Sequence, residues 1–257
     1  MPVNLVARQL LGLVQGFPHI AAGTGDQVLE RELPGHEGIV VAHEDIGQVL
    51  HAAPDHGAAQ GSRVGFLDFD AEASAALVAD LGGEAAGVAH EFCDLRDIEA
   101  LRAAIAALKA KLGGADVLIN NAARDDRHDW AEVTPEYWDE RMATNLRPMF
   151  FAIQAVAPEM IAAGGGSIVN IGSNSWWEAV GNFPAYATAK GAVHGLTRTM
   201  ARDLGKHRIR VNTVVPGWIM TERQKTLWLT NEARQRTLDA QCLKDMLLPP
   251  DIARMVL

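Results

Sequence analysis

Short apolar runs alternate with longer amphipathic segments along most of the chain, from Gly61 onward. Apolar runs of this length, bounded by turn residues, are typical of buried strands, and they occupy residues 63–69, 87–92, 116–120, 167–171 and 210–215. Helical patterns occupy residues 71–81, 98–112, 135–160 and 185–205. Alternating strands and helices predict a parallel sheet with helices on both faces. We therefore expect a single α/β domain with a doubly wound, Rossmann-like sheet.

The two ends of the chain depart from this pattern. Residues 1–57 hold five histidines, scattered glycines and prolines, and one convincing strand candidate at residues 38–42. We expect an atypical N-terminal segment there, in place of the usual first strand, loop and helix, and a regular core from residue 58 to residue 257. Residues 222–243 are predicted to be helical, where a substrate lid would lie. A last helix that starts near Pro250 runs to the end of the chain, which indicates a truncated C-terminus.

Composition narrows the classes of partner. The formal net charge of -9 argues against nucleic acid, because such binding depends on clustered Lys and Arg. Cys93 and Cys242 form neither a disulfide framework nor a metal motif, which favours a cytoplasmic location. The chain has no apolar run close to the roughly 20 residues that cross a bilayer, so no membrane is expected as a partner. The N-terminal histidines lack the spacing of metal ligands, so no metal is predicted.

The strongest chemical signal is the pair Tyr186 and Lys190, four positions apart in a predicted helix. That spacing places the phenol and the ammonium on one helix face. A tyrosine with its ordinary pKa near ~10 is a poor base unless a cation stabilises its phenolate, and Lys190 supplies that cation. Ser173, at the end of strand 167–171, is placed to hold a substrate oxygen, and Asn145 to anchor a water that relays protons. A YxxxK pair alone also occurs in ordinary solvated helices.

The ordered set resembles the short-chain dehydrogenase/reductase family, from about Gly61 to the C-terminus. The resemblance rests on Asn120, Asn121, Ala122, Ala123, Asn145, Ser173, Tyr186, Lys190, Pro216, Gly217 and Thr221. It implies that Asn145, Ser173, Tyr186 and Lys190 form a catalytic tetrad, in which Tyr186 exchanges the hydroxyl proton. It also implies that Lys190 binds the nicotinamide ribose, and that Asn121, Ala122, Ala123, Pro216, Gly217, Ile219 and Thr221 contact the cofactor. Family members commonly form tetramers, here through helices 135–160 and 185–205.

The end of strand 63–69 indicates which cofactor is used. Asp68 stands at the position that meets the adenosine ribose, where a carboxylate accepts both hydroxyls of NAD and repels the 2′-phosphate of NADP. NAD is therefore predicted, although Asp68 and Asp70 also fit a plain strand end. Asp94 and Leu95 resemble the family's adenine contact, and an Asp after a strand is also a common helix cap.

Several segments resemble more narrowly the sugar 1-dehydrogenases of this family, which oxidise aldoses to lactones. They include residues 125–128, 137–141, 145–147, 173–176, 221–224 and 240–244. A sugar pocket needs hydrogen-bonding groups, for which Asp126, Asn174 and Arg223 are candidates, and an aromatic face such as Trp176. The alternative is that the tryptophans are packing residues and the charges an exposed ion-pair face. We expect hydride transfer between NAD and a carbinol carbon, C1 of an aldose.

The position of the expected phosphate loop does not fit this enzyme. Counting back from Asp68 leads to residues 42–50, which hold one glycine and place Glu44 and Asp45 where backbone N–H groups would receive a pyrophosphate. One interpretation is that residues 1–57 are a frameshifted version of the natural segment. The alternatives for function are a 3-oxoacyl or ketone reductase of the same family, or a catalytically silent fold that lacks the phosphate loop.

Overall fold

A computed structural model of the chain describes residues 37–41 and 63–256, and these form a six-stranded sheet in which every pair of neighbours is parallel. The strands are β1 (Glu37–Val41), β2 (Arg63–Asp68), β3 (Val88–Phe92), β4 (Val117–Asn120), β5 (Gly166–Ile171) and β6 (Ile209–Val214). Their order is β3-β2-β1-β4-β5-β6, so the direction of winding reverses between β1 and β4. The predicted doubly wound α/β fold is confirmed.

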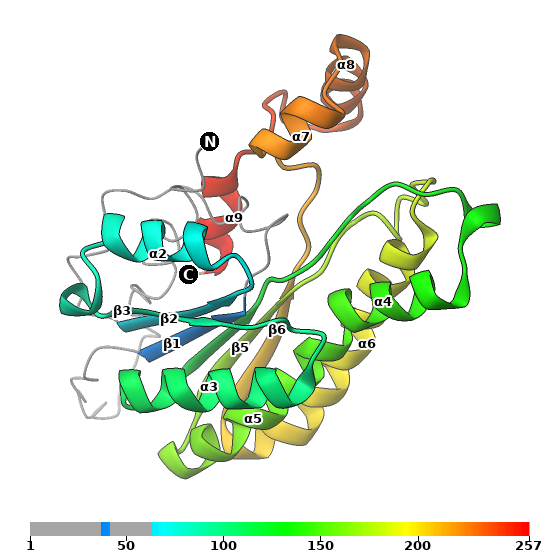
Figure 1. Cartoon of the computed structure of the whole chain (residues 1–257). Helices are drawn as coiled ribbons and strands as arrows, with labels where there is room; N and C mark the ends of the chain where they lie inside the picture. The colour runs from blue at the N-terminus through cyan, green and yellow to red at the C-terminus, as the bar shows by residue number, and fades with distance from the viewer. Residues whose placement is uncertain (1–36, 42–62, 257) are drawn as a thin grey trace, which may run out of the picture.

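Strand β1 occupies the centre of this sheet (Figure 1). Val41, its last residue, lies opposite Leu67 of β2 on one side and opposite Asn120 of β4 on the other. The strand candidate at residues 38–42 corresponds to β1 at Glu37–Val41, so the N-terminal quarter does supply a first strand. Residues 42–50, where the sequence predicts an unsuitable phosphate loop, lie outside the described residues, and the boundary at residue 58 stays a prediction.

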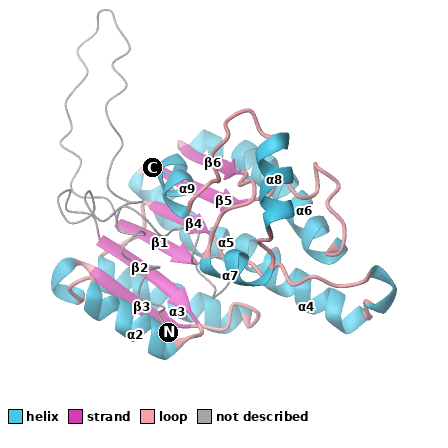
Figure 2. Ribbon diagram, turned by 90° about the horizontal axis from the view of Figure 1, so that it is seen from above, coloured by secondary structure: helices cyan, strands magenta, loops and turns pink. Residues whose placement is uncertain are grey.

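Helices cover both faces of the sheet (Figures 1 and 2). One face carries α3 (Ile98–Leu112), α5 (Arg147–Ala163) and α6 (Pro184–Leu204), and the other carries α2 (Ala71–Asp80) and α9 (Pro249–Val256). Successive strand residues alternate between two apolar cores, so Leu118 packs on the α3 face while Val117 and Ile119 pack on the opposite face. Short 3-10 helices occupy Glu84–Ala86, Trp130–Glu132 and Gly205–His207. In the described ranges, none of the helices is long and apolar enough to span a membrane.

The helical segment predicted at residues 135–160 is two helices. The first, α4 (Pro135–Asn145), ends at Leu146, whose φ of -134° breaks the helix before α5 begins. Pro148 stands in the first turn of α5, where its missing N–H costs no hydrogen bond. The break leaves Asn145 as the last residue of α4, with its side chain fully buried.

The helix predicted at residues 222–243 is also two, so the single-helix prediction is wrong. Trp228, with φ -135°, ends α7 (Glu222–Leu227), and the Thr230 side chain accepts a hydrogen bond from the Ala233 N–H at the start of α8 (Asn231–Ala240). A helix start of this kind needs a new N-cap, which the threonine supplies. Neither helix has a buried residue, and α8 stands clear of the sheet (Figure 1). We call residues 221–248 the lid.

A chain of polar side chains runs through the core beneath β5. Asn120 Nδ2 donates to Asn170 Oδ1 at 2.8 Å, and Asn170 Nδ2 donates to Thr197 Oγ1 at 2.9 Å. Thr213 Oγ1 lies 2.7 Å from the same Thr197 hydroxyl. These hydrogen bonds connect β4, β5, α6 and β6 within the core, although Asn120 Oδ1 has no hydrogen-bond partner among the described residues.

Candidate active site

The predicted site residues gather at the carboxyl edge of the sheet. Asp68 ends β2, and Asp94, Asn121, Ser173 and Pro216 follow the ends of β3, β4, β5 and β6 within two residues. In doubly wound sheets, ligands bind outside this edge, next to the point where the strand order reverses. The topology therefore brings together segments that lie far apart in the sequence.

Tyr186 and Lys190 face each other along the first turns of α6. Lys190 has no exposed surface, and its Nζ donates a hydrogen bond of 2.7 Å to the Ile171 carbonyl at the end of β5. Lys190 Nζ lies 5.8 Å from the centroid of the Tyr186 ring. The helix and the strand thus fix the ammonium beside the phenol, as the spacing of the two residues predicts.

Burial shifts the ionisation of both groups. Burial raises the pKa of Tyr186, and the negative charge of Asp125 raises it further, whereas the hydrogen bond from Ser173 and the charge of Arg127 lower it. Burial lowers the pKa of Lys190 to about 7, against a smaller opposing effect of Asp125. The ammonium and the phenolate favour each other, because each stabilises the charged form of its neighbour.

The other two members of the predicted tetrad have structural contacts of their own. Ser173 is buried, its Oγ lies 3.0 Å from Ser175 Oγ, and it accepts a hydrogen bond from the Ser175 N–H. Asn145 Oδ1 accepts from the Arg124 N–H at 2.6 Å, and Asn145 Nδ2 donates to the Arg141 carbonyl at 3.0 Å. The Asn145 side chain therefore fixes the loop after β4, and its predicted role in proton relay stays a prediction.

A cavity of about 710 Å³ opens in front of Tyr186, between this loop and the lid. Of the predicted residues, those that line it are Ser173, Asn174, Tyr186, Pro216, Gly217, Ile219 and Thr221. Ile219 also packs against Ile252, and Thr221 caps α7 through its side chain. The cavity has the size of a small-molecule site.

Asp126 and Arg223, both predicted to bind substrate, bind each other instead. Asp126 Oδ1 lies 2.8 Å from Arg223 Nη2, and Asp126 Oδ2 lies 2.7 Å from Arg124 Nε and 3.1 Å from Arg141 Nη1. Both oxygens of Asp126 are thus engaged by guanidinium groups. Asp126 and Arg223 are absent from the cavity lining, and their assignment to the substrate has no support from their positions.

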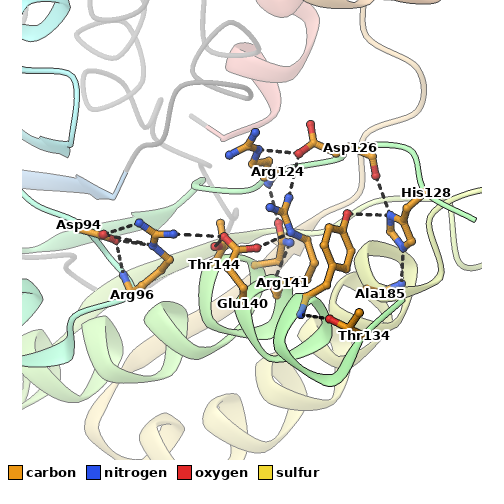
Figure 3. A network of polar contacts seen from close by, with 12 residues as sticks. Asp94, Arg96, Arg124, Asp126, His128, Thr134, Glu140, Arg141, Thr144 and Ala185 are labelled. Carbon is orange, nitrogen blue, oxygen red and sulfur yellow. Dashed lines mark hydrogen bonds and ion pairs between the residues drawn. The ribbon is translucent and has the colours of Figure 1, made fainter. Parts of the chain in front are cut away.

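Figure 3 shows that this ion-pair network continues from Asp126 to the far end of the carboxyl edge. Arg141 Nε binds Glu140 Oε2 at 2.5 Å, and Glu140 Oε1 lies 3.5 Å from Arg96 Nη1. Arg96 in turn holds Asp94, with Nη2 2.7 Å from Oδ2. The carboxylate predicted to meet adenine is therefore oriented by Arg96.

Trp176 lies outside the cavity lining. Its ring stacks on Trp177 at 5.6 Å and meets the edge of His194 at 5.1 Å, and it covers Gly191 on α6. The alternative that this tryptophan is a packing residue fits these contacts better than a substrate-facing role.

Comparison with known proteins identifies the family. The profile described as short chain dehydrogenase matches residues 46–232, which is most of the chain. The chain belongs to the short-chain dehydrogenase family. As a member of it, this protein is an oxidoreductase, and the family binds a nicotinamide dinucleotide.

Its relatives among short-chain dehydrogenases include two sugar enzymes. A protein named "Probable galactose dehydrogenase" from Rhizobium meliloti is 49% identical over 196 residues, which cover 76% of this chain and 77% of that protein. The D-xylose 1-dehydrogenase of Caulobacter vibrioides is 46% identical over 200 residues, 78% and 79% of the two chains. A gluconate 5-dehydrogenase from Burkholderia cenocepacia, solved with NADP and tartrate, is 28% identical with a TM-score of 0.76 over 87% of each chain.

The described residues fit the cofactor of short-chain dehydrogenases. Both amide atoms of Asn121 are buried and have no hydrogen-bond partner among the described residues, so a donor and an acceptor are available beside the end of β1. Asp68 Oδ1 accepts the Asp70 N–H at 3.0 Å. Ala123 packs against Tyr186, whereas Leu95 and Ala122 belong to the core under α3. In the described ranges no three His, Cys, Asp or Glu side chains are grouped as they would be around a metal.

Among the lining residues that were not predicted from the sequence are Asp125, Arg127, Gln224 and Trp228. The Arg127 guanidinium lies 3.9 Å above the Phe183 ring and 5.2 Å from Trp228. Three of these four residues belong to segments that resemble sugar 1-dehydrogenases, so the resemblance indicated the right segments of the cavity wall. The segments do not indicate which of their residues line the cavity, because neighbouring residues in a loop have no periodicity that shows which one faces inward. The substrate roles of Asp126 and Arg223 stay predictions.

Proposed function

We propose that this protein oxidises C1 of a neutral aldose to the lactone with NAD. One observation carries the proposal: Tyr186, with the buried Lys190 behind it, lines a cavity whose wall includes the hydrogen-bonding side chains of Asn174, Gln224 and Gln241. A ligand with several hydroxyls satisfies such a wall better than an apolar one does. The names of two relatives, a galactose dehydrogenase and a D-xylose 1-dehydrogenase, agree with this substrate class.

The residues of the site divide the reaction between them. Lys190 stabilises the phenolate form of Tyr186, and this phenolate takes the proton of the C1 hydroxyl and becomes a neutral phenol. Ser173, whose hydrogen bond already lowers the pKa of Tyr186, holds the substrate oxygen in line with the phenol. When bound, the nicotinamide ring supplies the acceptor for the hydride that leaves C1. Asn121 and Lys190 would hold that cofactor, together with Asp68 at the ribose.

The preference for NAD depends on Asp68, and replacing it tests this part of the proposal. Asp68→Ala should weaken NAD and improve NADP, lowering the ratio of kcat/KM for NAD to that for NADP about 10- to 100-fold, because the repelling carboxylate is gone. The values of kcat/KM for NAD and for NADP are measured with the same saturating aldose in the wild type and in the variant. Asp80→Ala, at the end of α2, is a control that should leave the ratio unchanged. An unchanged ratio in Asp68→Ala would make Asp68 a purely structural residue.

The alternative substrate class, a 3-oxoacyl chain or simple ketone, would use the apolar part of the same wall, which includes Phe183, Ile219 and Leu247. Assay of the purified chain with NAD and a panel of aldoses, against a panel of ketones with NADH, separates the two. Aldose oxidation that exceeds ketone reduction supports the proposal, and the reverse result refutes it. No turnover in either panel, with no NAD binding by calorimetry, would support the silent fold.

We also propose a cytoplasmic homo-oligomer that pairs through the α4, α5 and α6 surface. Trp138 on α4 and Phe150 on α5 are more than one-third exposed, as is Ile161. Exposed apolar side chains on neighbouring helices are typical of subunit contacts. Sedimentation of the wild type and of Phe150→Glu tests this, since the charge should shift the protein toward monomer.

A further inference from the structure

One buried oxygen in the cavity lacks a hydrogen bond. Asp125, in the loop after β4, lines the cavity and has 13% of its side chain exposed. Its Oδ2 accepts a hydrogen bond of 2.9 Å from Gln224 Nε2 on α7. Its Oδ1 is buried and has no hydrogen-bond partner among the described residues. Arg223 Nε forms an ion pair with Oδ1 at 3.7 Å, a separation too long for a hydrogen bond.

We propose that Asp125 Oδ1 accepts a hydrogen bond from a ring hydroxyl of the sugar and thereby selects which sugars bind. This inference rests on the proposed function, in that the ligand is taken to be a sugar. A carboxylate oxygen is an acceptor only, so the ligand group that meets it must be a donor. A hydroxyl meets this requirement, whereas a carboxylate or a keto oxygen does not.

The neighbouring carboxylates do not compete for this role. Asp126 uses both oxygens on Arg223, Arg124 and Arg141. Glu178, the other acidic residue of the cavity wall, lies in the exposed loop after β5 and accepts a hydrogen bond of 2.8 Å from Asn174. Asp125 is therefore the acidic side chain of the wall that is largely buried and keeps one oxygen with an ion-pair partner but no hydrogen bond from the described residues.

Asp125 is also close to the reacting groups. Its charge raises the pKa of both Tyr186 and Lys190, while Arg127 on the same loop lowers that of Tyr186. A hydroxyl held by Asp125 would belong to a carbon near the one that Tyr186 serves. Gln224 of α7 donates to the second oxygen of the same carboxylate. A sugar bound to Asp125 and Tyr186 would therefore connect α7, through Asp125, with the catalytic helix α6.

The test measures sugar binding without requiring turnover. Trp218 and Trp228 line the cavity, so quenching of tryptophan fluorescence reports the affinity for a preferred aldose and for each of its monodeoxy analogues. In the wild type, one analogue should bind about 10- to 100-fold more weakly, as expected for a lost hydrogen bond to a charged group. In Asp125→Asn, the parent sugar should weaken and the discrimination against that analogue should fall below about threefold.

Asp129→Asn is the matched control, because it removes a charge four residues along the same loop, where Asp129 only caps a short helix. This variant should keep the wild-type discrimination. Discrimination that survives in Asp125→Asn, or a wild type that binds every analogue equally or binds no aldose, overturns the inference. If Asp125→Asn does not fold, Asp125→Ala takes its place, and a wild type that does not discriminate overturns the inference without any variant. Selective binding without oxidation in the presence of NAD would refute the proposed function and leave this inference standing.

Discussion

The catalytic helix α6 and the lid helices α7 and α8 border the same cavity but are built differently. On α6, Tyr186, Lys190 and Thr197 are buried, and the helix packs along β6. The lid helices bury no residue, and polar contacts from Arg223 and Gln224 connect α7 to the loop after β4. Catalytic groups need a rigid support, whereas elements that admit substrate come from the less stable part of a protein. We therefore expect substitutions on α6 to change kcat for aldose oxidation, and substitutions on α7 and α8 to change the affinity for the aldose.

The largest expected effect is a loss of kcat on substitution of Tyr186 in α6. Tyr186→Phe removes the proton-exchanging hydroxyl without opening a cavity, so kcat for aldose oxidation should fall at least about 10³-fold while the melting temperature stays unchanged. Tyr137→Phe is the matched control, since Tyr137 OH binds His128 Nδ1 at 2.9 Å, away from the cavity lining. Activity of Tyr186→Phe within tenfold of the wild type would contradict the assignment.

A second substitution tests the rigidity of the same helix. Thr197→Val should lower the free energy of unfolding by about 1–3 kcal/mol, because it leaves Asn170 Nδ2 without its acceptor and removes the contact to Thr213. Thr199→Val, on the exposed side of α6, should change it by less than about 0.5 kcal/mol. Urea denaturation of both variants measures the difference. Equal stabilities would mean that the buried polar chain does not hold α6 in place.

Substitution of Arg223 in the lid should have a smaller effect, on KM rather than on kcat. Arg223→Ala breaks the ion pair with Asp126 and the contact with the Trp228 ring, so KM for the aldose should rise about fivefold with kcat nearly unchanged. Its cost in stability should stay below about 1 kcal/mol, as is usual for a partly exposed pair. The exposed Arg234 on α8 provides a control, Arg234→Ala, with wild-type kinetics. A fall in kcat without a change in KM would place Arg223 on the catalytic side of the comparison.

The smallest effect is a shift along the pH axis. Oxidation needs the Tyr186 phenolate, whose pKa Asp125 raises and Arg127 lowers. Asp125→Asn should therefore move the rising limb of the kcat profile to lower pH, and Arg127→Ala should move it to higher pH. Both profiles are recorded with aldose and NAD at saturation. Shifts in the same direction would show that neither charge acts directly on the phenol.

The elements that could be predicted from the sequence are those with a local signal. The apolar runs that became β2 to β6, and the spacing of Tyr186 and Lys190, depend only on residues near one another in the chain. The break at Trp228 has no Gly or Pro beside it, so the helical pattern continues through it in the sequence. The break at Leu146 is followed by Pro148, a helix-start signal that the single range 135–160 passed over. Strand β1 was predicted as an isolated strand. Its central place in the sheet could not be predicted, because that place depends on pairing with β2 and β4, which lie far away in the sequence.

The substrate side was harder to predict for a related reason. Asp125 and Asp126 are adjacent, and only the positions of Arg124, Arg141 and Arg223 decide that both oxygens of Asp126 bind guanidinium groups at 3.1 Å or less while Asp125, 3.7 Å from Arg223, lines the cavity. Those arginines come from the loop after β4, from α4 and from α7. Such a choice is made by tertiary contacts, which no local pattern encodes.

The central position of β1 also governs how the chain reaches its fold. Gly38 of β1 pairs with Val117 of β4, across two complete strand and helix units. Parallel pairings with this sequence separation give a high contact order and form slowly. Until β4 arrives, one side of β1 presents unpaired N–H and C=O groups, which other chains can pair with. Recovery of this protein after refolding is therefore set by the competition between the docking of β4 and intermolecular pairing at β1, and dilution favours the native partner.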